Sequence, residues 1–511
     1  MMSAIRAGLV LLLLPLAPAA QDVNRFEKRV TEFTLANGLR FLVLERHGTP
    51  VVSFHTYVRA GSADDPAGQT GMAYLLDHVL FNGTDAIGSR NWAEERKALD
   101  VVEETYGRLQ SERNLGPKAD QNRIDMLETR MRLAIDAADR LGMPEAYTAE
   151  LEESGGAVGS HNATADATEC SYSLPSNLIE LWFLMESQRL QRPALRSFYG
   201  TRNALAEDWR KWLAGSPQPQ LFGVLLGSAF LAHPYRHPLG GWPGDMSSLS
   251  RTEARAFFEK YYVPGNVVMT LVGDANPGEV KALASKYFGT WPARPVPPLV
   301  PTREPQQAGP KMVAIESTTP GHMLIGYKRP DQFDKDDPVF DVVQILLTQG
   351  RSGLLYEELV GNRHVAQAVE GASSMPAGRY PNLFLLRLTA AQGHSVEENQ
   401  QALDEFLNRL KVQAMDAVTL ARGRAQARSI VLNRLMTNAG MAAMLGSYES
   451  NYGDWRKLFT ELDQLNRITA EDIQRVLVKY FVPSGRTVAY TVLPGQAGLP
   501  ARRSSGGIEK R

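Results

Sequence analysis

Hydrophobic and polar positions alternate along some stretches of this 511-residue chain and recur at helical spacing along others. The Asn37-Gly38 pair separates two alternating stretches, which is typical of a two-residue hairpin turn. In chain order, the stretches with a clear strand or helix pattern are residues 29–35, 39–45, 51–60, 69–81, 313–327 and 338–348. Strands and helices therefore mix along the whole chain. This mixture predicts an α+β protein whose sheets are covered by helices on one side.

One pattern occurs twice. Residues 256–274 and 475–493 both read as a helix end, an aromatic pair, Val-Pro, a small turn and an alternating strand, and Pro264 and Pro483 are 219 positions apart. Each repeat is preceded by a helix-capping pattern, Ser250 to Glu253 in the first and Thr469 to Asp472 in the second. Because turn chemistry and periodicity agree, the chain is predicted to consist of two related halves.

The segment between the two repeats is rich in proline. Seven prolines lie within the 19 residues from Pro292 to Pro310, a density that neither a helix nor a central strand tolerates. We therefore expect a linker at 291–311 between an N-terminal half at 28–290 and a C-terminal half at 312–495. Residues 496–511 are polar and are predicted to be a disordered tail.

Residues 93–142 carry two amphipathic stripes interrupted by Gly116-Pro117, which predicts a charged helical hairpin inserted in the first half. The stripes are Leu99, Val102, Tyr106 and Leu109, then Ile124, Leu127, Met131 and Ala134. The hairpin is either an arm that docks a partner or a packed surface insertion. We favour packing, because amphipathic stripes usually serve it.

The N-terminus is typical of an exported protein. Arg6 precedes an apolar run at 7–16 and small residues at 17–20, so residues 1–20 are predicted to be a signal peptide cut after about Ala19. The run is shorter than the ~20 residues of a membrane span. No span is expected after cleavage, and the single Cys170 excludes an internal disulfide. The formal net charge of −1 does not suggest a nucleic-acid partner.

Residues 71–84 contain the candidate catalytic motif. They read Gly-Met-Ala-Tyr-Leu-Leu-Asp-His-Val-Leu-Phe-Asn-Gly-Thr and resemble the zinc-binding helix of the pitrilysin/insulinase family, whose signature is H-x-x-E-H. Further stretches similar to the family are 61–64, 80–84, 155–156, 162–164, 198–202, 232–235, 262–264 and 273–274. The resemblance covers nearly the whole chain. It implies two halves that close as a clamshell around a cavity.

The family motif needs two His on one helix face to bind zinc, a Glu as general base and a third ligand from another helix. Here Tyr74 stands at the first His position and Asp77 at the base position, while His78 is retained. Aligned on the family, Asp208 takes the third-ligand position, and Thr201 replaces a supporting acid. Because a catalytic zinc normally has three protein ligands, we expect zinc to be absent or weakly bound.

Two further groups follow from the resemblance. His161, Asn162 and Ala163 lie on the strand whose edge pairs with substrate backbone in the family, and His161 is a possible replacement ligand. Tyr356 matches a position at a helix start that faces the cavity, although simple packing explains it equally well. These four residues are the expected substrate-binding set.

The family pairing of a zinc-bearing subunit with a degenerate one implies a role for a chain of this kind. We expect a periplasmic or secreted, non-catalytic subunit that binds peptide substrate beside a homologous catalytic subunit with an intact H-x-x-E-H. Two alternatives stay open. One is an active peptidase that uses His78, Asp208 and His161 with Asp77 as base, and the other is a stand-alone peptide-binding or scaffold protein.

Overall fold

The computed structural model describes residues 27–319 and 321–495, and two sheets organise it. The strands of the six-stranded sheet are, in spatial order, β1 (Val30–Thr34), β2 (Arg40–Glu45), β6 (Val267–Gly273), β3 (Val51–Val58), β5 (Thr168–Pro175) and β4 (Ala157–Ala163). Those of the five-stranded sheet are β7 (Lys311–Glu316), β11 (Arg486–Val492), β8 (His322–Arg329), β10 (Asn382–Ala390) and β9 (Ala366–Met375). The mixed architecture of two helix-covered sheets confirms the predicted fold class. The predicted signal peptide and tail lie outside the described residues.

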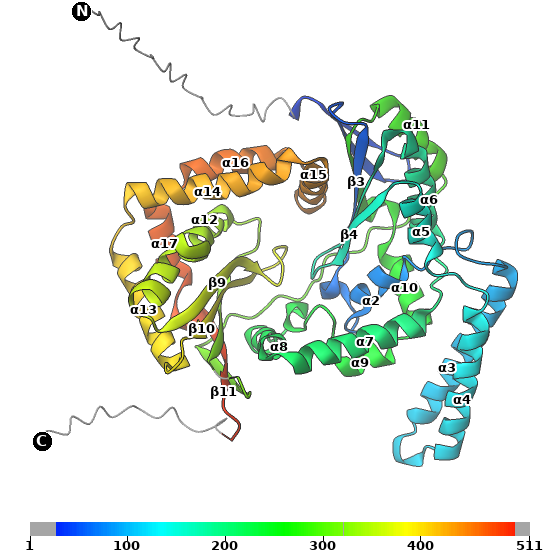
Figure 1. Cartoon of the computed structure of the whole chain (residues 1–511), viewed down its shortest axis with the longest axis horizontal. Coiled ribbons are helices and arrows are strands. Elements are labelled where there is room, and N and C mark those ends of the chain that lie inside the picture. Colours follow the sequence, from blue (N-terminus) through cyan, green and yellow to red (C-terminus); the bar gives the residue numbers. More distant parts are fainter. Residues whose placement is uncertain (1–26, 320, 496–511) are drawn as a thin grey trace, which may run out of the picture.

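Helices lie on both sides of each sheet (Figure 1). In the first half they are α2 (Met72–Val79), α3 (Trp92–Arg113), α4 (Gln121–Asp139), α5 (Ala146–Glu153), α6 (Ile179–Gln191), α7 (Phe198–Gly215), α8 (Pro217–Ala229), α9 (Pro243–Ser248), α10 (Arg251–Tyr261) and α11 (Pro277–Phe288). In the second half they are α12 (Asp337–Thr348), α13 (Val396–Val412), α14 (Ala417–Met436), α15 (Asn438–Tyr452), α16 (Lys457–Arg467) and α17 (Ala470–Tyr480). Within the described residues, none of these helices combines the length and the apolar character needed to cross a membrane.

Strand β2 shows why both faces of the first sheet are covered. Phe41 and Val43 enter the core under α6 and α11, whereas Leu42 and Leu44 enter a second core formed with α15 and α16. Side chains alternate between the faces of a strand, so a continuous hydrophobic run requires cover on both sides. The one-sided cover expected from the sequence was therefore wrong, because the second layer comes from the other half of the chain.

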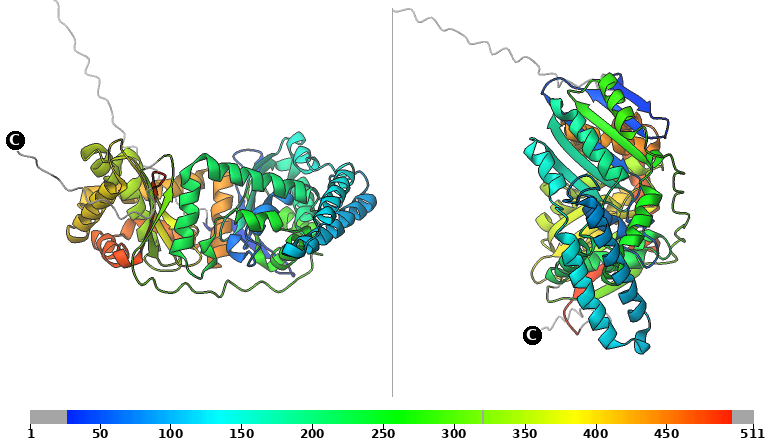
Figure 2. Two further views of the ribbon diagram at one scale, coloured as in Figure 1. Left: turned by 90° about the horizontal axis from the view of Figure 1, so that it is seen from below. Right: turned by 90° about the vertical axis from the view of Figure 1, so that its right-hand side faces the viewer.

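The two halves exchange helices. Helix α8 of the first half packs against β8 and β11 of the second sheet, and α15 of the second half packs against β3 and β6 of the first. Arg40 on β2 forms an ion pair with Glu449 on α15, whose side chain is 1% exposed. The halves therefore share their cores. The extended segment between them runs along one side of the molecule (Figure 2).

Helices α3 and α4 form an antiparallel hairpin that projects from the first half (Figures 1 and 2). Its base is anchored by Tyr106, whose hydroxyl donates a 2.7 Å hydrogen bond to the carbonyl of Ser248 and lies 3.0 Å from Arg202 Nη1. Farther out, Leu109, Ile124 and Leu127 pack against each other. The hairpin thus has its own small core, and the docking arm stays an untested alternative to the packed insertion.

Both predicted helix-capping patterns are present in the structure. The Ser250 hydroxyl accepts from the backbone of Glu253, and the Thr469 hydroxyl accepts from that of Asp472, each with the reciprocal bond of a capping box. The hairpin between β1 and β2 turns at Gly38, whose φ of +94° favours glycine. The stretch expected at 313–327 is divided into β7 and β8, which are separate strands of one sheet.

Candidate functional site

Helix α2 begins at a tightly fixed corner. Gly71 has a φ of +91°, and a Cβ there would come within 2.7 Å of the Gly240 carbonyl oxygen. The Asp65 carboxylate accepts hydrogen bonds from the backbone N–H groups of Gly71 (2.7 Å) and Ala73 (2.9 Å). Asp65 therefore caps the helix that carries Tyr74, Asp77 and His78. Sequence reasoning missed it, because the cap lies six residues before Gly71 rather than next to the helix.

Asp77 on α2 is bonded to His161 on β4. His161 Nδ1 lies 2.9 Å from Asp77 Oδ2, and the Asp77 side chain is 2% exposed. The other oxygen, Oδ1, finds no hydrogen-bond partner among the described residues. The carboxylate at the general-base position therefore holds a histidine of the edge strand.

His78 and His161 face each other across this corner. Their ring centroids are 5.2 Å apart at an interplanar angle of 87°, and the Phe81 ring lies 4.5 Å from that of His161 at an angle of 31°. His78 Nδ1 lies 2.9 Å from the Tyr74 carbonyl oxygen. Because each Nδ1 faces an oxygen acceptor, Nδ1 donates in both rings, and in the neutral form of each ring Nε2 is the acceptor. The corner thus presents two imidazole acceptors.

Tyr74 makes a poor metal ligand here. Its side chain is half-buried, and its ring lies 4.7 Å from that of His78. Burial raises the pKa of its phenol, and the nearby carboxylates of Asp77 and then Asp208 raise it further. A phenol must lose its proton to ligate strongly, so this environment opposes ligation.

Asp208 lies on α7 and faces solvent. Its side chain is 74% exposed, and its Oδ1 atom lies 3.9 Å from Lys211 Nζ. The adjacent Glu207 pairs with Arg210 and Lys211 and is also partly exposed. The structure therefore brings Tyr74, Asp77, His78 and His161 together. It leaves Asp208 close enough to influence Tyr74 but highly exposed to solvent.

These residues do not fit a catalytic zinc. Such a site needs three protein ligands, and across residues 27–319 and 321–495 no group of three or more His, Cys, Asp or Glu side chains is arranged to hold a metal ion. Tyr74 is unsuited as a ligand and Asp208 is largely exposed, which leaves the imidazoles of His78 and His161. The arrangement can bind through hydrogen bonds and ring contacts, and no metal-dependent step follows from it.

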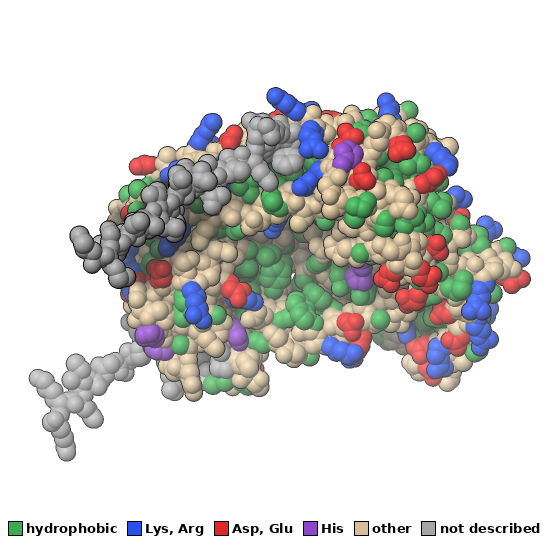
Figure 3. Space-filling view, turned by 45° about the horizontal axis from the view of Figure 1, so that its top comes forward, with side chains coloured by type: hydrophobic (Ala, Val, Ile, Leu, Met, Phe, Trp, Pro, Cys, Tyr) green, Lys and Arg blue, Asp and Glu red, His purple; other side chains and the backbone are tan. Residues whose placement is uncertain are grey.

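The expected substrate-binding residues belong to both halves of the chain. Strand β4 is the edge of its sheet; Asn162 is exposed on it, and the Ala163 side chain is buried. Tyr356 begins η7 (Tyr356–Asn362), in the second half. No hydrogen bond, ion pair or ring contact between the described residues joins Tyr356 to the α2 corner. The face in Figure 3 is hollowed between the halves, and hydrophobic side chains gather in the hollow.

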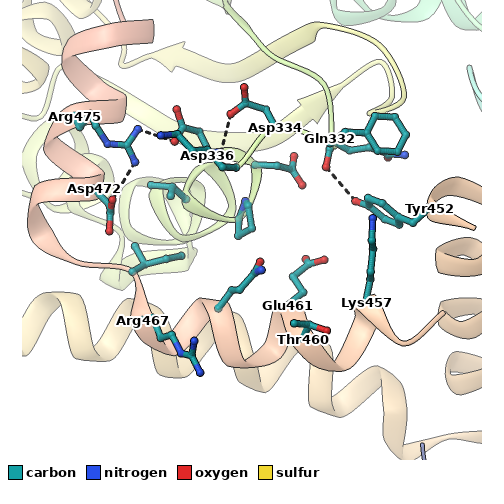
Figure 4. Close-up of a pocket in the computed structure, with 17 residues that line it drawn as sticks. Gln332, Asp334, Asp336, Tyr452, Lys457, Thr460, Glu461, Arg467, Asp472 and Arg475 are labelled. Atoms are coloured by element: carbon teal, nitrogen blue, oxygen red, sulfur yellow. Dashed lines mark hydrogen bonds and ion pairs between the residues drawn. The ribbon is translucent and has the colours of Figure 1, made fainter. Parts of the chain in front are cut away.

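A separate cavity of about 720 Å³ lies in the second half, beside α12, α16 and α17 (Figure 4). Arg475 joins Asp336 (2.6 Å) and Asp472 (3.0 Å) on its wall, and Tyr452 donates to the Gln332 carbonyl oxygen. None of the residues predicted for the site lines this cavity. Arg475, Asp336 and Asp472 are paired with each other, which is typical of a structural cluster.

Comparison with known proteins gives the family. The model described as peptidase M16 inactive domain matches residues 248–427, and that described as insulinase (peptidase family M16) matches residues 40–101. The zinc protease PqqE of Helicobacter pylori is 21% identical over 491 residues, which are 94% of this chain and 97% of PqqE.

Solved structures agree on the fold. A protease from Helicobacter pylori superposes with a TM-score of 0.75 at 19% identity, over 91% of this chain and 99% of that one. The periplasmic protease PqqL of Escherichia coli gives 0.64 at 15% identity, over 91% of this chain but only 48% of PqqL. With the H-x-x-E-H-like helix in place at α2, residues 40–101 and 248–427 of this chain are peptidase M16 (insulinase/pitrilysin) family domains.

Proposed function

We propose that this protein is an exported, substrate-binding subunit of a zinc peptidase and has no catalytic activity of its own. The observation that carries the proposal is the bond between Asp77 and His161. A general base must reach the proton it accepts at about 2.6–3.2 Å. The Asp77 Oδ2 atom is bonded to His161, and its Oδ1 atom is buried without a partner among the described residues. Both features support a structural role for Asp77 in place of a general base.

The chain has an edge strand that can hold a polypeptide. Strand β4 is an edge strand, and exposed residues occupy most of its length. An extended peptide can add to such an edge through backbone hydrogen bonds, which give affinity with little sequence preference. This supports a binding role for unfolded polypeptides or peptides, with His161, Asn162 and Ala163 along the binding edge.

A catalytic partner is the second part of the proposal. This chain corresponds to about half of the periplasmic protease PqqL, whose first half has also been solved as a separate structure. A chain of this size is thus comparable to one unit of a longer, two-unit protease. We propose that a homologous chain with an intact H-x-x-E-H supplies the other unit, in the periplasm or outside the cell.

One observation favours a rival function. His161, predicted as a possible replacement ligand, does lie beside His78, as an active peptidase with a remodelled site requires. Two observations weigh against this rival: Asp77, its base, is hydrogen-bonded to His161, and Asp208, its third ligand, is 74% exposed. The stand-alone scaffold function shares the binding surface and differs only in having no catalytic partner.

The test separates binding from cleavage. The full chain is mixed with fluorescently labelled, carboxymethylated casein, with and without added zinc. The proposal predicts saturable binding by anisotropy and no new fragments on gels. Cleavage that is abolished by chelation and by His78→Ala would contradict it. Adding the homologous H-x-x-E-H chain should produce cleavage, and a failure to do so would favour the scaffold function.

A further inference from the structure

A second cavity lies where the two halves share their cores. Its volume is about 390 Å³, within the roughly 300–1,000 Å³ typical of ligand pockets. Trp212 on α7 and Phe222 on α8 form one wall, and Leu324, Ala372, Met375 and Leu385 of the second sheet form the other. The cavity is thus built from both halves of the chain.

The register of the second sheet explains why these side chains meet. Ala372 on β9 pairs with Leu385 on β10, so both side chains lie on one face of the sheet. Arg387, two residues after Leu385, shares that face and pairs with Leu324 on β8. This is the face that α8 covers. Helix α8 leaves the part beside Ala372 uncovered.

The charges at the rim are already balanced. Arg387 forms an ion pair with Glu370 and also donates to the side-chain oxygen of Gln218 on α8. An incoming charged group would have to break this set of bonds or stay unpaired against an apolar wall. The cavity therefore suits an uncharged, apolar group.

The cavity is close to the α2 corner. Trp212 follows Asp208 by four positions on α7, so the two side chains share one helix face about one turn apart. Asp208 in turn influences Tyr74. Helix α7 therefore contacts α2 and also lines the cavity. Strand β9, which contributes Ala372, is an edge strand of its sheet.

We infer that this cavity receives one bulky apolar side chain, such as Phe or Leu, of a polypeptide bound along the hollow. The inference rests on the proposed function, since it names the kind of residue that the bound polypeptide presents. The backbone would be held without regard to sequence, and this cavity would add a preference for an aromatic or branched aliphatic residue.

Two short, uncharged peptides that differ at one central position, Phe or Ser, are made to compete with labelled casein for the full chain. We expect the Phe peptide to compete at a concentration at least tenfold lower. Ala372→Leu, which fills the cavity, should reduce that ratio to about two or less. Ala368→Leu is the matched control, because Ala368 lies on the same strand and face as Ala372 but outside the cavity.

Trp212→Ala is a second test variant, for use if Ala372→Leu does not fold. Trp212 is 50% exposed, so its removal should leave the fold intact. It should also lower the ratio while casein binding is retained. Equal competition by the two peptides against wild type would overturn the inference and leave the proposed function standing. If casein itself does not bind, the proposed function fails, and the inference fails with it.

Discussion

Asp77 Oδ2 lies 2.9 Å from His161 Nδ1, and this one bond connects helix α2 to the edge strand β4. By resemblance to the family, Asp77 stands at the position of the general base, and β4 matches the strand whose edge pairs with substrate backbone. Here the buried carboxylate holds the strand instead. The shorter Asp at this position is thus hydrogen-bonded to the edge strand.

The first prediction concerns this contact. His161→Ala leaves the Asp77 carboxylate buried without a partner, so we expect the free energy of unfolding to fall by about 2–3 kcal/mol. Adding Asp77→Asn should recover part of that loss, because the buried charge is then removed. Urea unfolding of the single and double variants measures both effects.

The chain offers a matched control for His161. His47 Nδ1 lies 2.7 Å from Asp274 Oδ1, but the two side chains are 61% and 35% exposed. His47→Ala should cost no more than about 1 kcal/mol, as for other exposed pairs. Equal losses at the two positions would mean that burial of Asp77 does not matter.

The second prediction concerns pH. Burial, and then repulsion from Asp341, raises the pKa of Glu461 to about 7. The folded protein therefore holds a proton that the unfolded chain has lost, so Glu461 makes stability fall as pH rises from about 4.5 to about 7. Glu461→Gln removes this loss and keeps an acceptor for the Tyr448 hydroxyl.

We expect Glu461→Gln to unfold at a higher temperature than wild type at pH 8, by the equivalent of about 1–3 kcal/mol. The gain should largely vanish at pH 5. Glu104→Gln, at an exposed position on α3, serves as the control and should show no such pH-dependent gain. A gain for Glu461→Gln of the same size at both pH values would argue against a raised pKa.

The third prediction concerns the exchange of helices. A Cβ at Gly446 on α15 would lie 2.9 Å from Thr270 Oγ1 and 3.2 Å from His55 Cδ2, both in the first sheet. Gly446→Ala should therefore destabilise the protein by about 1 kcal/mol or more. Gly107→Ala on α3 meets no atom within 4 Å and should stabilise by about 0.5–1 kcal/mol. Thermal unfolding of the two variants measures both effects. A gain in stability at both positions would contradict the close packing of α15.

The repeat made much of the fold predictable. Val-Pro turns at Pro264 and Pro483, with capping boxes before them, have local signals that recur at a fixed offset. The exchange of α8 and α15 could not be predicted, because nothing in an amphipathic helix says which sheet it will cover. The apolar run of β2 was the available signal, since it requires cover on both faces.

The site was predictable in part. Tyr74, Asp77 and His78 were placed together by helical spacing, and His161 came from the family resemblance. The bond from Asp77 to His161 joins positions 84 residues apart, and no local pattern encodes it. Asp208 was expected at the metal position, but its high exposure depends on how α7 packs, which no local pattern encodes.

Zinc content tests the central claim most directly. The purified wild-type chain is compared with the triple variant Tyr74→His/Asp77→Glu/Asp208→Glu by elemental analysis after dialysis against trace zinc. We predict less than about 0.1 zinc per wild-type chain and a gain toward one in the variant, because the variant restores three ligands and the base. One zinc per wild-type chain, together with casein cleavage, would contradict the claim and identify a working peptidase.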